Sequence, residues 1–204
     1  MKLKKIGFTN LIVKGTEWFS NLALLNLCWL LFSLPLVTLI PATDAAFTVV
    51  YEWEQVGRPA HTFQHFKKAF KTNFKRSFKL GLPLLLIAII VAVDVYYLNQ
   101  VALTTSWFQI IKYAFYTFTF LLILAILYAY PLMKQTGEAH IRVLVMGLLM
   151  AVGHPLISLG VIGSLIVLVL IFLMWPGMLF FFGLSAITWL MTKTVANIMK
   201  KART

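Results

Sequence analysis

Two aspartates stand among apolar residues of this 204-residue chain, where a carboxylate could hold a cation, share a proton or contact a partner. Asp94 is the one charged residue of the apolar run Leu80–Tyr97, and Asp44 follows Pro41. Counted at the helical rise, Asp94 lies about 21 Å into its helix, in the outer third of a membrane. We expect Asp44 at a similar depth. Either the two form a polar site within the membrane, or Asp94 simply reaches interfacial water.

Few other residues could carry chemistry. His61 and His65 have the spacing of a metal-binding pair, but no third ligand lies nearby, so we expect solvated histidines and no metal. Cys28 is the only cysteine, so an internal disulfide is excluded and a small packing residue is expected. The sequence has no G-x-S-x-G, H-E-x-x-H or P-loop motif. We therefore expect no enzyme and no cofactor.

A third candidate is the basic and aromatic stretch FKKAFKTNFKRSFK at residues 66–79. Side chains four apart are neighbours on a helix, so this stretch predicts one stripe of phenylalanines beside one stripe of cations. Such a helix suits the headgroup layer of a membrane. The phenylalanines are Phe66, Phe70, Phe74 and Phe78; the cations are Lys67, Lys68, Lys71, Lys75, Arg76 and Lys79.

Three roles are open for this basic stretch. It could be a plain cytoplasmic loop that fixes topology, or a docking surface for a cytoplasmic partner. It could also bind the anionic inner leaflet, where each lysine contributes about 1 kcal/mol. Aromatics and cations also alternate in proteins that bind single-stranded nucleic acids. Because the stretch is pinned between two expected spans, we expect no nucleic acid.

Composition determines the class of protein that must hold these residues. Hydrophobic residues make up 61 % of the chain and the mean hydropathy is +0.89. Only 12 % of residues are charged, yet the net charge is +12. Apolar clusters separated by cationic loops indicate an all-α integral membrane protein.

The pattern predicts a single membrane domain over 1–204, with about six membrane-inserted helices and two short amphipathic helices at the inner surface. Trp175, Pro176 and Gly177 break the last apolar region into two spans. The expected segments are a Pro-broken hairpin at 18–57, a cytoplasmic basic amphipathic helix at 62–79, a pair of spans at 80–99 and 107–133, a cytoplasmic helix at 138–152, and a span hairpin at 156–193.

Cation placement predicts the orientation of these segments, because lysine and arginine collect in cytoplasmic loops. Cations cluster near the N-terminus, around residues 58–79, and near the C-terminus. We therefore expect both termini in the cytoplasm and an even number of crossings in 18–57. This places Asp44 near the outer surface and Lys134 at the inner one. Whether 41–57 crosses fully or re-enters stays open.

The segment NLCWLLFSLPLVTLIPATDAAF, residues 26–47, resembles the N-terminal signature of the YesL-like family, a group of bacterial membrane proteins gathered as a domain of unknown function. Five residues carry the likeness most clearly: Asn26, Trp29, Pro35, Thr38 and Pro41. The stretch FKTNFKRSFKLGL at 70–82 extends it. Asp44 departs from the small residue expected in that turn.

The resemblance implies a multi-pass protein of the bacterial plasma membrane, and genes of this family often sit among genes for carbohydrate ABC importers. We expect a non-catalytic accessory or regulatory subunit that binds an importer permease or a membrane sensor. The chain itself lacks a permease coupling motif, because His140 follows Glu138 and Ala139. The alternative is a small ion- or solute-conducting protein that uses Asp94 and Asp44.

Overall fold

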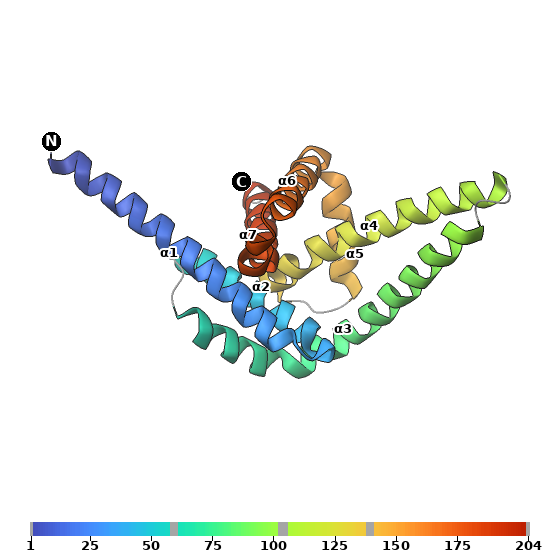
Figure 1. Cartoon of the computed structure of the whole chain (residues 1–204), viewed down its shortest axis with the longest axis horizontal. Coiled ribbons are helices and arrows are strands. Elements are labelled where there is room, and N and C mark those ends of the chain that lie inside the picture. The colour runs from blue at the N-terminus through green and yellow to red at the C-terminus, as the bar shows by residue number, and fades with distance from the viewer. Residues whose placement is uncertain (1, 58–60, 102–105, 138–140, 203–204) are drawn as a thin grey trace.

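A computed structural model describes residues 2–57, 61–101, 106–137 and 141–202 (Figure 1). These residues are entirely helical apart from short connections, which confirms the predicted all-α class. The elements are α1 (Lys2–Ser33), the 3-10 helix η1 (Leu36–Thr38), α2 (Leu39–Val56), α3 (Thr62–Val101), α4 (Ser106–Thr136), α5 (Ile141–Gly153), α6 (Pro155–Met174) and α7 (Pro176–Ala202).

Figure 1 shows a packed body with two projecting arms. α2, α7 and parts of α1, α3 and α4 meet in the body. The N-terminal part of α1 projects to one side, and the far ends of α3 and α4 project together to the other. Many large apolar side chains of α3, α4 and α6 are exposed, as expected of helices that face lipid.

Three helical segments are long and apolar enough to cross a membrane: Trp107–Thr136, Pro155–Met174 and Pro176–Lys201. They match the predicted span at 107–133 and the predicted C-terminal hairpin. The hairpin turns at Trp175, and Pro176 opens α7, where its missing N–H costs no helical bond. The three segments indicate an integral membrane protein.

The basic stretch and the predicted span after it form one helix. We predicted separate segments at 62–79 and 80–99, whereas α3 runs through both and bends in its middle (Figure 1). Gly81 and Pro83 lie in that middle part. A Cβ on Gly81 would stand 2.1 Å from Cγ2 of Ile40, so glycine lets α3 and α2 approach closely.

α2 lies antiparallel along the first half of α3. The pairs that meet are His65 with Glu52, Asn73 with Thr48, and Gly81 with Ile40. The two segments therefore share one orientation. A hairpin that crosses the membrane at 41–57 and a helix that lies flat at 62–79 cannot both be correct.

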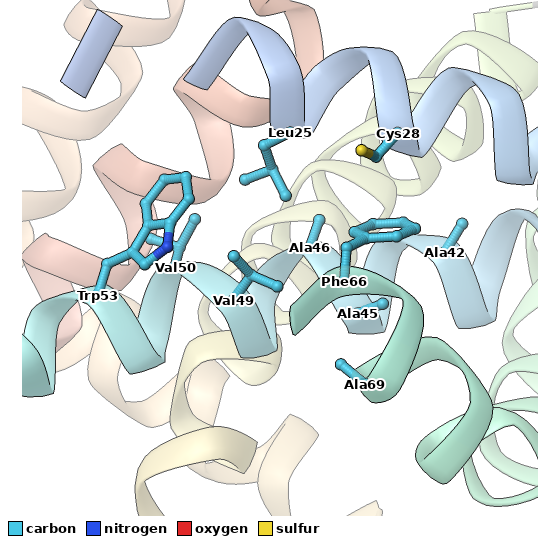
Figure 2. Packing of buried hydrophobic residues seen from close by; sticks show 10 residues of the cluster. All are labelled: Leu25, Cys28, Ala42, Ala45, Ala46, Val49, Val50, Trp53, Phe66 and Ala69. Carbon is cyan, nitrogen blue, oxygen red and sulfur yellow. The ribbon is translucent and has the colours of Figure 1, made fainter. Parts of the chain in front are cut away.

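The main core fills the space between α1, α2 and α3 (Figure 2). α2 presents alanines and valines on one face, which lets its neighbours come close, and Phe66 of α3 is fully buried there. Cys28 of α1 is 2 % exposed in the same core, which confirms its predicted packing role. Figure 2 shows Leu25, Cys28, Ala42, Ala45, Ala46, Val49, Val50, Trp53, Phe66 and Ala69.

α5 folds back along the second half of α4. A Cβ on Gly147 would lie 2.6 Å from the carbonyl oxygen of Ala125, so the two backbones touch there. The partly buried helix predicted at 138–152 is thus α5, although residues 138–140 lie outside the described residues. A second core forms where α4, α5, α6 and α7 meet, with Tyr128 at its centre.

Candidate functional site

Asp44 forms an ion pair in the body of the molecule. Its Oδ1 lies 2.6 Å from Nζ of Lys134, and the two side chains are 3 % and 12 % exposed. α2 supplies the carboxylate and the C-terminal end of α4 supplies the ammonium. A buried pair of this kind gains little net stability, but loss of one partner leaves an unpaired buried charge.

A second contact ties the same helices together. Nη2 of Arg76 donates to the carbonyl oxygen of Gly137, 2.9 Å away, just after α4 ends. Gly137 has a φ of +71°, the left-handed conformation that commonly ends a helix. α3 thus supplies a cation to the negative end of the α4 dipole. Arg76, Asp44 and Lys134 together join α2, α3 and α4.

Asp94 lies far from this cluster. It stands on α3, 21 residues after Asn73, which corresponds to about 31 Å along the helix. Its side chain is partly exposed, and it makes no ion pair within the described residues. The structure therefore does not bring Asp94 and Asp44 into one polar site.

The predicted depth of Asp44 is wrong relative to Lys134. We placed Asp44 near the outer surface and Lys134 at the inner one, whereas the two are in direct contact. The two depths were deduced separately from charge placement, which does not record the contact between α2 and the end of α4. Lys134 was missed as a site residue; its sequence signal was a cation at the end of an apolar run, but nothing linked it to a residue 90 positions earlier.

The phenylalanines and the lysines of the basic stretch form neighbouring stripes that differ in burial. Phe66 is fully buried, and its ring lies 5.3 Å from that of Phe32 in α1. The phenylalanines also contact one another in sequence along α3, through Phe70 and Phe74 to Phe78. Phe66 and Phe70 thus pack against Phe32 of α1, and Phe70, Phe74 and Phe78 are half-buried. Four lysines of the stretch are exposed: Lys67, Lys68, Lys71 and Lys75.

Asn26 joins α1 to α7 through the backbone. Its Nδ2 donates to the carbonyl oxygen of Phe180 at 2.6 Å, and its Oδ1 accepts from the N–H of Leu184 at 2.8 Å. These two backbone groups are four residues apart and would ordinarily be each other's helical partners. Ser185 adds a second N–H, 3.2 Å from the same Oδ1. The 1 % exposed amide is fully bonded.

The other residues of the family-like segment shape the turn between α1 and α2. Nε1 of Trp29 donates to Oγ1 of Thr43 at 3.1 Å. Oγ1 of Thr38 donates to the carbonyl oxygens of Phe32 and Pro35, at 2.6 Å and 2.7 Å, and so bonds the groups freed where α1 ends. Pro35 is exposed, while Pro41 is buried in α2. These residues have structural roles in this turn.

Comparison with known proteins singles out the same region. Residues 22–95 match the family model described as Protein of unknown function, DUF624. The matched part, less than half of the chain, contains Asn26, the α1–α2 turn, Asp44 and both stripes of α3. No curated protein and no solved structure matches the chain. The match does not indicate an activity, because the family is uncharacterised.

Of the two histidines, His65 contacts a neighbouring helix. Nδ1 of His65 lies 2.5 Å from Oε2 of Glu52, both side chains being about half exposed. His61 stands just before α3, with a φ of +47°. Within the described residues, no three His, Cys, Asp or Glu side chains gather in a way that could hold a metal ion.

Proposed function

We propose that this chain is a non-catalytic accessory or regulatory subunit of the bacterial plasma membrane, which presents the lysine face of α3 to a partner. This proposal rests on a difference in burial between neighbouring side chains of one helix. Phe66 is fully buried, whereas Lys67 and Lys71 are exposed. Packing along α2 fixes the direction in which the lysines point. A row of cations in a fixed orientation is electrostatically complementary to an acidic surface on a partner.

The partner class follows from the resemblance. Genes of YesL-like proteins often sit among genes for carbohydrate ABC importers, so we propose an importer permease or a membrane sensor of that system as the partner. Asn26, Asp44 and Arg76 each join two helices, which supports a structural and non-catalytic role for these polar residues of the body.

For topology, we propose that both termini are cytoplasmic. The second half of α3 leads out, α4 returns, α6 leads out and α7 returns. α1 and α2 add a shallow hairpin that enters the membrane from the cytoplasmic side without crossing it, which gives about six inserted segments. Because exposed lysines avoid hydrocarbon, the end of this hairpin in α2 lies at the cytoplasmic surface beside the first half of α3.

Thiol labelling tests this topology. In a Cys28→Ala background, a single cysteine at Thr72 should resist an impermeant reagent in intact cells. A cysteine at Thr104, in the connection between α3 and α4, should react. Reaction at Thr72 without permeabilisation would overturn the proposed orientation.

Pull-down from native membranes tests the partner. Replacement of Lys67, Lys71 and Lys75 by Gln should lower partner recovery several-fold in mild detergent, and raised salt should act similarly on the wild type. A matched variant with Gln at Lys2, Lys4 and Lys5 makes the same change in charge elsewhere and should retain recovery. Equal recovery per correctly oriented molecule for both triple variants would leave the stretch as a topology signal only.

The conducting alternative finds less support. Its two carboxylates would have to act together, but Asp44 is neutralised by Lys134 and Asp94 lies far along α3. Ion or solute flux through liposomes that contain this chain alone, reduced by Asp94→Asn, would favour that alternative over the subunit role.

A further inference from the structure

A cavity of about 390 Å³ lies where the C-terminal part of α2 meets the C-terminal ends of α4 and α7. Its volume falls within the range of small-molecule sites. Polar side chains from all three helices line it, among them Tyr51, Glu54, Gln135, Thr192 and Lys200. None of these was singled out by the sequence, and none belongs to the lysine face of α3.

Two of the residues that line this cavity each carry a buried polar atom without a hydrogen-bond partner among the described residues. Thr192 is 1 % exposed, and its Oγ1 makes no hydrogen bond within the described residues. Nε2 of Gln135 is likewise buried without a hydrogen-bond partner among the described residues. An unpaired buried polar atom costs about 1–3 kcal/mol. One turn earlier, Oγ1 of Thr188 donates to the carbonyl oxygen of Leu184 at 2.8 Å. The threonine hydroxyls of α7 can therefore bond to the helix backbone, and Thr192 departs from this pattern.

The cavity also carries one charge of each sign. Glu54 comes from α2 and Lys200 from α7, and the described residues show no ion pair for either. A carboxylate and an ammonium on separate walls complement a ligand with the opposite charges at its two ends. A ligand with a single charge would leave one wall without a counter-charge.

We propose that this cavity binds a small zwitterion that carries an ammonium group and a carboxylate or phosphate group. The ligand's ammonium faces Glu54, and its anionic group faces Lys200. The side chains of Gln135 and Thr192, whose unpaired atoms are buried in the wall of the cavity, turn toward the ligand and donate to its oxygens. Two sources share this chemistry: a free α-amino acid, and the phosphoethanolamine headgroup of a membrane lipid. The inference goes beyond the proposed subunit role and does not depend on it.

Calorimetric titration of the purified full chain in detergent tests the proposal with two probes, glycine and glycerophosphoethanolamine. At least one should bind. Tighter binding of glycine identifies the amino acid source, and tighter binding of glycerophosphoethanolamine identifies the headgroup. Ethanolamine and acetate, which each carry one of the charges, should bind at least tenfold more weakly than the better zwitterion.

Variants separate a ligand site from a structural role. Thr192→Val should weaken binding at least fivefold, yet raise the melting temperature of the unliganded protein, because an unpaired hydroxyl is removed. Glu54→Gln and Lys200→Gln should each weaken binding tenfold or more. Thr188→Val, the matched control one turn away, should leave binding unchanged.

Three results would overturn the proposal: no binding of either zwitterion, equal binding of ethanolamine or acetate, or binding that survives both Thr192→Val and Glu54→Gln. A rise in melting temperature for Thr192→Val without zwitterion binding would show that the cavity holds only water and is not a ligand site.

Discussion

Asp44 and Asp94 are the same residue type in similar apolar sequence, and they meet opposite surroundings. Asp44 lies in the packed body, 3 % exposed and paired with Lys134. Asp94 lies on the projecting arm formed by α3 and α4, partly exposed and without an ion pair among the described residues. The comparison teaches that residue type and estimated depth do not decide what an apolar-stretch carboxylate does. The helices packed against it decide.

The body as a whole is built from contacts that tolerate little change. Asn26 is inserted against the backbone of α7, Gly147 against the backbone of α4, and Asp44 against one cation. The arm depends on fewer such contacts; one is the bond from the hydroxyl of Tyr116 to Oδ1 of Asn99, 2.7 Å long. Substitutions in the body should therefore cost more than substitutions in the arm.

The largest effect is expected from Lys134→Met. It leaves the carboxylate of Asp44 buried and unpaired, which costs about 3–5 kcal/mol. The free energy of unfolding in detergent should fall by that order, measured by reversible chemical denaturation. Asp44→Asn should cost less, because the lysine stem can carry its ammonium toward water.

A double variant sharpens this first prediction. Asp44→Leu combined with Lys134→Met removes both charges, and its stability should return to within about 1–2 kcal/mol of the wild type. If the double variant is as unstable as Lys134→Met alone, then the two residues act separately and the ion pair is not what joins α2 to α4.

The next effect is expected from Asn26→Asp. This change keeps the size of the side chain but replaces the donor Nδ2 with an acceptor oxygen that faces the carbonyl of Phe180. A lost bond with an unsatisfied partner costs about 1–3 kcal/mol. Asn26→Ala should cost less than Asn26→Asp at pH 8, because the α7 backbone groups can then bond to each other. Thermal unfolding of the two variants measures the order, and the reverse order would contradict the amide orientation.

Gly147→Ala should cost about 1–3 kcal/mol, because the added Cβ meets the backbone of Ala125 and must push α5 away from α4. Gly163→Ala in α6 is the matched control. No atom lies within 4 Å of its Cβ position, and alanine favours a helix over glycine by up to about 1 kcal/mol. Melting temperatures should therefore move in opposite directions for the two variants.

The local features of this fold were predictable, and the long-range ones were not. Periodicity gave the helix that carries the two stripes, and Pro176 with its neighbours gave the turn between the last two helices. The continuity of α3 was missed, because a surface helix followed by a span has the same pattern whether or not the two are joined. The Asp44–Lys134 pair and the cavity at Thr192 depend on helices far apart in sequence, whose approach no local pattern records.

The smallest effect is expected from Asp94→Asn. The carboxylate is partly exposed and has no counter-ion within the described residues, so its removal breaks no pair and leaves no buried charge. Stability should change by less than about 0.5 kcal/mol, as for most exposed substitutions, and membrane insertion should be unchanged. An altered partner recovery or flux in this otherwise stable variant would then report a functional role of Asp94 alone. A loss of stability as large as that of Lys134→Met would show instead that the arm holds Asp94 as tightly as the body holds Asp44, and the contrast between the two regions would fail.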